Sequence, residues 1–538
     1  MAGSKLLAKA YAISLMGLAG TVIEVESEIS SSLPGFVLVG LPDASLSESK
    51  DRVRAAIQNS GLKMPDRRVT VNLSPASVRK QGSSYDLAIA VSIMSAAGIF
   101  RAESSAQTHW VHLGELGLDG SVRSVTGILP ALLVAKSAGI TNAVVPEANL
   151  TEALLVSDMN IKGVRHLCEV AQMFGVSVAE VGGGADSAGD GVVAKPQAPQ
   201  KRDFTSLDIA DVLGQEDAIE ALTVAAAGGH HLLMVGPPGA GKTMMAERLP
   251  TILPDLTLDD ALQTTAVISI SENRNFVGGT LMLRPPFEAP HHSASVSSLV
   301  GGGMGMPRPG LISLAHHGVL FLDEAPEFQK SVLEALRQPL ESGEVVIHRS
   351  GGTARFPAKF QLVLAANPCP CGNAFGLAKT CRCSPQQLAN YLSRLSGPLL
   401  DRVDIRLTVR PASSAQMAAA RSSSSGGKTS VQIKAEVTEA RSRALKRLAG
   451  TPWTTNAQVP GPYLRKKLAL SEASVMHLEK ALSMGRISMR GFDRCLRLAW
   501  TSADLAGRKV PDKFDVAKAM HLRGPESLLD TAAEFRNA

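Results

Sequence analysis

Aromatic residues are scarce in this chain of 538 residues. Phe, Trp and Tyr together make up 4% of it, which argues against a surface that binds single strands mainly by stacking bases on aromatic rings. The charge balance is only mildly basic, with a formal net charge of +6 and a sequence pI near 9.0. This composition permits contact with nucleic acid without demonstrating it.

Long apolar runs are also missing. The longest covers residues 87–100 and is shorter than the ~20 residues that a membrane-spanning helix needs, so we expect a buried helix and no membrane attachment. Near the start, Lys5 and Lys9 precede an apolar stretch that continues into the alternating pattern of residues 21–25. That pattern favours a strand over an export signal. Six cysteines without such a signal indicate the reducing cytoplasm.

The length of the chain exceeds what one hydrophobic core holds, so two or three domains are expected. The composition changes at residues 179–203, which read as a flexible linker, and again at the Ser- and Gly-rich residues 413–430, which read as a connection. The sequence therefore predicts an α/β front domain, an α/β nucleotide-binding core and a helical lid, over residues 1–178, 204–412 and 431–538.

A complete phosphate-binding loop stands at residues 236–243, with the sequence Gly-Pro-Pro-Gly-Ala-Gly-Lys-Thr, after an apolar run at residues 232–235 that we expect to form a buried strand. Glycines let backbone amides turn toward phosphates, the lysine reaches the outer phosphates, and the threonine hydroxyl can ligate Mg²⁺. We therefore predict binding of ATP and Mg²⁺ by Gly236, Gly239, Gly241, Lys242 and Thr243.

Two further apolar strands end in residues suited to hydrolysis. Residues 318–322 lead to Asp323, expected in the magnesium shell, and to Glu324, expected to orient and polarise the attacking water. Residues 360–366 lead to Asn367, placed to sense the outer phosphate or to hold that water. Paired acids can be only a helix cap, and an asparagine only a turn former. Their order after a full phosphate loop favours catalysis.

Two arginines are candidates for contacts with the phosphates. Arg402 resembles the finger that a neighbouring subunit inserts at the phosphate, which is worth about a thousandfold or more in rate. An isolated ion pair with Asp401 or Asp404 is the alternative. Arg490 begins an amphipathic segment with one basic face, and we expect it to contact the nucleotide of its own subunit.

Four cysteines bracket a short loop directly after Asn367. So many thiols in so short a span indicate a structural zinc site, although the one-residue gaps within each pair depart from the commoner spacing. A reduced cysteine-rich loop, or two redox-active pairs, are the alternatives. The residues concerned are Cys369, Cys371, Cys381 and Cys383.

The front domain resembles the proteolytic domain of Lon-type proteases at residues 80–84, 114–120 and 125–128. Ser84 stands where the nucleophile of a Ser-Lys dyad would be. The position of the lysine falls near Leu129, so the hydroxyl has no base to activate it. We expect a Lon-like domain without proteolytic activity.

Taken together, the nucleotide-binding residues resemble those of AAA+ ATPases, and the chain as a whole resembles the magnesium-chelatase-like YifB/ComM family. The segments that carry this resemblance are residues 39–43 (Val-Gly-Leu-Pro-Asp), 289–295 (Ala-Pro-His-His-Ser-Ala-Ser), 307–310, 312–316, 334–341 and 367–372 (Asn-Pro-Cys-Pro-Cys-Gly). They extend nearly from end to end, so the match is more specific than a phosphate loop alone.

The resemblance also indicates which residues of this chain would contact DNA. Residues 345–349 and 353–356 read as a hairpin, and the segment 276–310 is a Gly-rich insertion. In hexameric helicases of the same branch, hairpins at these places line the central channel. Arg349 and Arg355 are therefore candidates for sequence-independent contacts with DNA phosphates. A hairpin that simply faces solvent is the alternative.

The resemblance implies a ring-forming, hexameric ATPase of the cytoplasm that moves along single-stranded or branched DNA. Its task would be helicase-type branch migration in natural transformation or recombination. The rival function is a magnesium-chelatase-type motor subunit that remodels a partner inserting magnesium into a porphyrin. A nucleotide-controlled scaffold is a third possibility. The Lon-like front domain and the cysteine loop favour the DNA motor.

Overall fold

The computed structural model describes residues 6–40, 44–78, 80, 82–100, 110–177, 206–271, 280–303, 307–349, 352–373, 381–414, 416, 427–525 and 528. The expected linker at residues 179–203 lies outside these ranges, as do most of the connection at 413–430 and residues 41–43 of the family-like segments. Among the described residues, no helix combines the length and hydropathy needed to cross a bilayer.

The front domain is built on a seven-stranded sheet in the order β3-β4-β2-β1-β5-β8-β9. Its strands are β1 (Leu6–Met16), β2 (Ala19–Ser30), β3 (Gly35–Val39), β4 (Arg68–Ser74), β5 (Trp110–His112), β8 (Asn142–Pro146) and β9 (Asn160–Val164), with a small pair β6 (Glu115–Leu116) and β7 (Val122–Arg123). Its helices are α1 (Ala44–Asn59), α2 (Asp86–Ala96), α3 (Ile128–Ser137), α4 (Leu150–Ala153) and α5 (Leu167–Met173). The long apolar run is the buried helix α2, as predicted.

The central domain contains a five-stranded sheet in the order β11-β14-β17-β10-β18, in which every pair is parallel. Its strands are β11 (Phe287–Glu288), β14 (Val319–Leu322), β17 (Gln361–Ala366), β10 (Leu232–Val235) and β18 (Ile405–Thr408). Alternate residues of β10 belong to two different cores, Leu232 to one and Leu233 to the other. The strands β10 and β14 are continuous apolar runs, because helices cover both faces of the sheet.

The helices of the central domain are α6 (Glu216–Gly228), α7 (Lys242–Ile252), α8 (Leu258–Ser269), α9 (Val296–Val300), α10 (Leu311–Leu314), α11 (Lys330–Ala335), α12 (Arg337–Ser342), α13 (Pro385–Leu392) and α14 (Gly397–Leu400). Two hairpins leave it, β12 (Gly301–Gly302) with β13 (Arg308–Pro309), and β15 (Glu344–Arg349) with β16 (Gly352–Pro357). The hairpin predicted from residues 345–356 is therefore present.

Helices make up the last part of the chain: α16 (Ser430–Arg447), α17 (Gly461–Lys466), α18 (Glu472–Ser483), α19 (Met489–Leu505) and α20 (Lys513–Arg523). Helix α19 begins after Ser488, whose side chain accepts a hydrogen bond from the Gly491 amide at 3.1 Å. The apolar faces of α16 and α19 pack on α6 and share its core. The mixed α/β fold with a helical end agrees with the predicted fold class.

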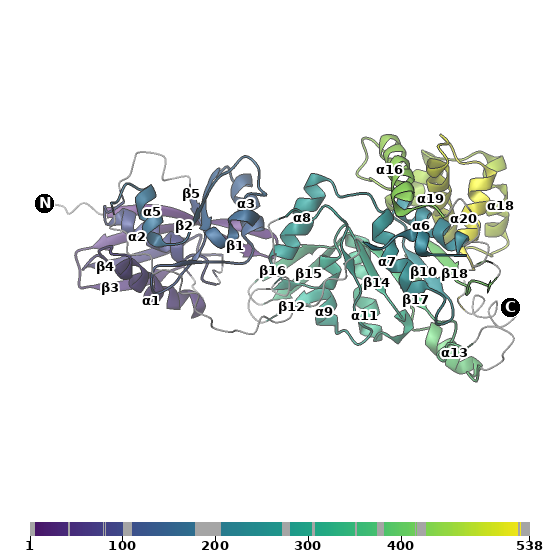
Figure 1. Ribbon diagram of the computed structural model, residues 1–538, viewed down its shortest axis with the longest axis horizontal. Coiled ribbons are helices and arrows are strands. Elements are labelled where there is room, and N and C mark those ends of the chain that lie inside the picture. Colours follow the sequence, from purple (N-terminus) through teal and green to yellow (C-terminus); the bar gives the residue numbers. More distant parts are fainter. Residues whose placement is uncertain are drawn as a thin grey trace.

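The front domain docks on the central domain through the turn between β1 and β2 and through α3 (Figure 1). Gly17 in that turn forms a β-bridge with Arg355 of β16. Helix α3 packs against α8, where Ser269 donates a hydrogen bond to Glu152 of α4. The glycine is needed, because its φ is +69° and a Cβ there would lie 2.7 Å from the Arg355 carbonyl oxygen.

Candidate functional site

The parallel sheet divides the functional residues between two edges. All carboxyl ends of parallel strands lie at one edge, which we call the carboxyl edge, and all amino ends lie at the other, the amino edge. The phosphate loop follows β10, Asp323 follows β14 and Asn367 follows β17. The sheet therefore brings the three predicted segments together at the carboxyl edge.

Glycines shape the phosphate loop for specific reasons. Gly239 and Gly241 have φ values of +78° and +88°, in the left-handed region that favours glycine. Gly236 is needed for close packing, since a Cβ there would lie 2.3 Å from the Val409 carbonyl oxygen. The loop ends where α7 begins at Lys242, so the amino end of this helix faces the cradle, an arrangement suited to phosphate.

Lys242 is buried beneath the loop. Its ammonium donates to the carbonyl oxygens of Gly236 at 2.7 Å and Pro237 at 3.0 Å, and to Oδ1 of Asn367 at 3.1 Å. Burial lowers the pKa of Lys242, while the nearby charges of Asp323 and Glu324 act in the opposite direction. The lysine and the predicted sensor asparagine therefore lie in direct contact.

The magnesium ligands predicted from sequence also meet. The Thr243 hydroxyl donates to Oδ2 of Asp323 at 2.6 Å, and an exposed hydroxyl beside a carboxylate is an oxygen set that suits Mg²⁺. Glu324, which follows, has a φ of +50°, which is uncommon for a residue with a side chain. Its carboxylate is 51% exposed, so water can reach it.

Sequence reasoning did not identify one neighbour of this acid. Nδ1 of His292 lies 3.7 Å from Oε2 of Glu324, and the ring of His292 lies against that of His291, tilted by 36° with centroids 4.0 Å apart. Both histidines lie between β11 and α9. The only signal in the sequence was the His-His pair itself, which does not tell which strand end it faces.

Arg402 lies at the opposite edge from the phosphate loop. It stands just before β18, which runs parallel to β10, so the two are separated by the length of a strand, roughly 13 Å for four residues. Arg402 forms an ion pair with Glu341 of α12 and is 19% exposed. Neither Asp401 nor Asp404, the partners considered from sequence, takes this contact. Within one subunit, Arg402 is out of reach of its own phosphate loop.

Arg490 differs from its predicted position. The sequence placed it at the nucleotide of its own subunit, but here it forms an ion pair with Asp401, next to Arg402 at the amino edge. The reason is the packing of α19, whose apolar face lies on α6 and whose neighbouring Arg494 pairs with Asp404 just before β18. This packing directs the start of α19 toward the amino edge.

The two arginines predicted to contact DNA lie on the hairpin β15–β16. Arg355 is 61% exposed and pairs with Glu344 across the hairpin at 2.6 Å. Arg349 is exposed near the tip, and its Nη2 would lie 3.4 Å from a Cβ on Gly302 of the second hairpin. The two hairpins are therefore neighbours, and β13 adds the exposed Arg308, which sequence reasoning did not single out.

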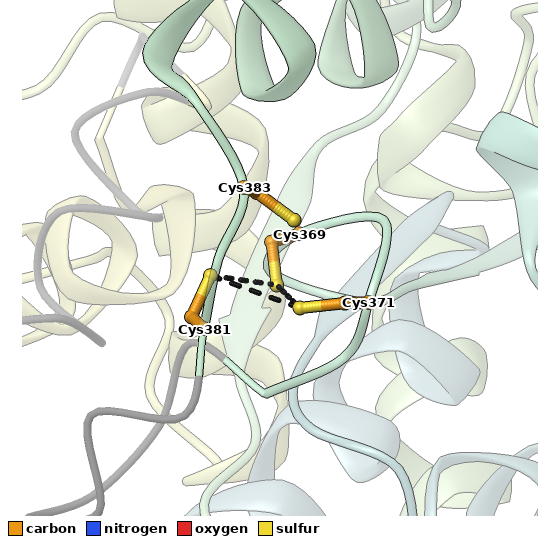
Figure 2. Close-up of side chains that lie close together, drawn as sticks. All are labelled: Cys369, Cys371, Cys381 and Cys383. Atoms are coloured by element: carbon orange, nitrogen blue, oxygen red, sulfur yellow. Dashed lines mark hydrogen bonds between the residues drawn. The ribbon is translucent and has the colours of Figure 1, made fainter.

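The four cysteines of the loop converge (Figure 2). All four Sγ atoms lie within 4.8 Å of one another, with 3.4 Å between Cys369 and Cys371 and 3.7 Å from Cys381 to each of them. Tetrahedral zinc with bonds of about 2.3 Å sets its sulfur ligands about 3.8 Å apart. Disulfides do not join these thiols. A hydrogen bond from the Asn373 amide lowers the pKa of Cys371 to about 7, which favours a thiolate.

Comparison with known proteins shows the family of this chain. Residues 208–417 match the family model of magnesium chelatase, subunit ChlI, residues 427–523 match its C-terminal model, and residues 25–149 match a model of subunit ChlI of Mg-chelatase. The competence protein ComM of Haemophilus influenzae is 41% identical over 526 residues, covering 97% of this chain and 98% of ComM. The chain belongs to the magnesium-chelatase-like ComM/YifB family.

Two other relatives differ in how much of this chain they match. YifB of Escherichia coli is 38% identical over 510 residues, 94% of either chain. The magnesium-chelatase 38 kDa subunit of Rhodobacter capsulatus is 28% identical over 171 residues, only 29% of this chain and 49% of that protein. ComM/YifB proteins therefore share the whole arrangement of this chain, including its front domain, and the chain is a magnesium-chelatase-like AAA+ ATPase.

Proposed function

We propose that this ComM/YifB family member forms a hexameric ring that hydrolyses ATP to move along DNA and to drive branch migration. The observation that carries the proposal is the separation of Arg402 from its own phosphate loop by the sheet. A finger arginine at the amino edge can serve only the nucleotide of a neighbouring copy, and head-to-tail contacts of this kind form a ring when the rotation between copies closes.

Each residue at the carboxyl edge has a role in the proposed hydrolysis. Lys242 and the loop amides hold the outer phosphates, and Thr243 and Asp323 would hold Mg²⁺, which supplies charge neutralisation for the phosphates. Glu324 orients and polarises water, helped by Asn367, which already contacts Lys242 at 3.1 Å. Arg402 of the adjacent copy would stabilise the charge that develops on the transferred phosphate.

DNA is the proposed track. The paired hairpins expose Arg308, Arg349 and Arg355 on one side of the central domain, and arginines bind phosphates without regard to sequence. The competence role in the name of ComM agrees with a substrate of single-stranded or branched DNA. The strand would pass through the ring beside these hairpins.

We propose that the four cysteines hold a structural zinc ion. Three of the sulfur distances lie close to those of a tetrahedral site, and the ion would join the loop after Asn367 to the start of α13, which follows Cys383. Its role would be to hold the strand end that carries the sensor asparagine, because Cys369 is only two residues away.

The rival function, a chelatase motor, has one specific observation in its favour. The three matching family models are named for magnesium chelatase. The chelatase subunit itself, however, aligns with only 29% of this chain, whereas ComM aligns with 97% of it.

Unwinding of a branched DNA by the purified protein tests the proposal. We expect ATPase activity stimulated by forked or single-stranded DNA, and ATP-dependent unwinding. Glu324→Gln should still assemble with ATP but unwind nothing, because it keeps the phosphate contacts and loses the water-polarising carboxylate. Glu327→Gln is the matched control, since this nearby acid pairs with Arg394 at 3.6 Å and has no proposed role.

Two results would count against the proposal. Normal unwinding by Glu324→Gln would show that another group polarises the water. ATPase activity indifferent to DNA, but raised by a porphyrin-binding partner, would favour the chelatase motor.

A further inference from the structure

Three arginines gather at the amino edge, and each is held by its own carboxylate. Arg402 pairs with Glu341, Arg490 pairs with Asp401, and Arg337 pairs with Glu334 at 2.7 Å. We call Arg337, Arg402 and Arg490 the arginine cluster. The sequence predicts roles for Arg402 and Arg490 and none for Arg337.

Helix geometry explains why Arg337 lies beside Arg402. Arg337 and Glu341 are four residues apart on α12, so their side chains lie on the same face of that helix. Glu341 is the residue that contacts Arg402. Arg337 is therefore on the face of α12 that carries Glu341, the partner of Arg402. The pKa of Arg402 is lowered first by burial and then by the charges of Arg337, Arg490 and Arg494, which agrees with this closeness.

The cluster faces away from the phosphate loop of its own subunit. Arg402 and Asp401 lie a few residues before β18, at the amino edge, and both α12 and Arg490 join them there through ion pairs. Within the cluster, Arg337 is 44% and Arg490 75% exposed. A ligand from outside the subunit can therefore reach these guanidinium groups, whereas the subunit's own nucleotide cannot.

The chemistry of the cluster selects a strongly anionic ligand. Guanidinium groups bind phosphate oxygens in a bidentate manner, and several close together are stable only with compensating negative charge. Glu334, Glu341 and Asp401 supply that charge within one subunit. The outer phosphates of a nucleotide can take their place when a second copy of the chain presents its phosphate loop.

We propose that Arg337 is a second arginine acting on the neighbouring subunit, and that with Arg402 it binds the outer phosphates of the nucleotide held there. Glu334 and Glu341 position the two guanidinium groups until that nucleotide arrives. This inference rests on the proposed ring, and it adds a residue that contacts the substrate of the reaction.

Mixed rings test the inference directly. Arg337→Ala should lower ATPase activity about tenfold or more, because charge-assisted hydrogen bonds to the phosphates are lost. Glu324→Gln should be inactive for a different reason. When the two variants are mixed, some interfaces join the phosphate loop of an Arg337→Ala subunit to the arginine cluster of a Glu324→Gln subunit. The first subunit supplies an intact Glu324 and the second an intact Arg337, so that site is complete. About one interface in four is then complete in a randomly mixed ring, so activity should rise well above the mean of the two variants.

Arg443→Ala is the control, because Arg443 is 39% exposed and, like Arg337, pairs with a carboxylate nearby in the chain, that of Glu439 at 2.9 Å. Its activity should equal that of the unmodified protein. If Arg337→Ala fails to assemble, Arg337→Lys keeps the charge without the fork and should show an intermediate rate. Light scattering and thermal unfolding establish that each variant assembles and folds.

Full activity of Arg337→Ala in assembled rings would overturn the inference. So would mixed rings of normal size that recover no activity, since that result places Arg337 at its own subunit's site. Either outcome leaves the proposed function intact if the unmodified ring is an active, DNA-stimulated ATPase. Absence of ring assembly and of DNA stimulation in the unmodified protein would instead remove the proposed function itself.

Discussion

The carboxylate of Asp404 connects the ATPase sheet to the helical lid, and replacing it tests how the two are held together. Asp404 is 2% exposed, accepts a hydrogen bond from His230 Nδ1 at 2.9 Å, and pairs with Arg494 of α19. His230 in turn hydrogen-bonds Thr501 of α19 at 2.8 Å. One buried acid therefore joins the start of β18, the segment that leads into β10, and the lid.

The expected cost of Asp404→Asn follows from this burial. Removing one partner of a buried ion pair costs about 3–5 kcal/mol, because the other charge stays desolvated. Asparagine keeps the shape and one acceptor oxygen, so we expect the lower end, about 3 kcal/mol. For a unit of this size that corresponds to a fall of about 5 °C in the unfolding midpoint.

The effect should persist across the neutral pH range. Burial by itself would raise the pKa of Asp404, but the Arg494 charge and the hydrogen bond from His230 outweigh it and hold that pKa well below its usual range. A carboxyl group with a lowered folded-state pKa stabilises the fold above its unfolded pKa and loses this contribution only in acid. The difference between Asp404→Asn and the unmodified protein should therefore be constant from about pH 6 to pH 8.

Thermal unfolding followed by tryptophan fluorescence is the assay, because Trp500 is buried on α19. Asp158→Asn serves as the control, since that acid is 84% exposed beside Lys136. The double variant Asp404→Asn with Arg494→Leu should lose less than the sum of the two single changes, because no unpaired charge then remains. A midpoint for Asp404→Asn equal to that of the control would refute the reasoning.

Two further predictions concern the docked front domain and the cysteines. Gly17→Val should loosen the front domain and raise its hydrogen exchange at β1 and α3, because a Cβ at Gly17 would lie 2.7 Å from the Arg355 carbonyl oxygen. Gly98→Ala should not raise this exchange, since Gly98 has a similar φ of +67° but a Cβ there would meet nothing within 4 Å. Equal exchange in the two variants would argue against the docking. Cys371→Ser should lower the zinc content measured by elemental analysis, because it removes one of four converging thiols. Cys168→Ser, outside the cluster, should keep it, and a protein purified without zinc would contradict the proposed site.

The functional residues at the carboxyl edge of the sheet could be predicted from local sequence. The strand β10, the glycines of the loop and the start of α7 are contiguous in the chain, so their chemistry could be predicted without knowing the fold. Asp323 and Asn367 could be predicted as well, because each follows an apolar strand and parallel strands bring their carboxyl ends together. The convergence of the four cysteines needed only the closure of a short loop.

The amino edge could not be predicted in the same way. The position of Arg490 depends on how α19 packs on α6, and that of Arg337 depends on the contact between Glu341 and Arg402. The docking of Gly17 on Arg355 joins residues far apart in the chain. Such contacts are set by tertiary packing rather than by local pattern, and isolated charges carry little signal about their partners.

In the proposed motor, ATP hydrolysis would change contacts at the amino edge, and these contacts lie at the base of the protein hairpin β15–β16 that is proposed to bind DNA. Glu341, which holds Arg402, lies at the end of α12, and β15 begins at Glu344 directly after it. Glu344 pairs with Arg355, whose backbone forms the bridge to Gly17 of the front domain. A neighbouring nucleotide that draws Arg402 away from Glu341 would therefore release a contact at the base of the hairpin. The front domain, bound to the same hairpin, would then move with it.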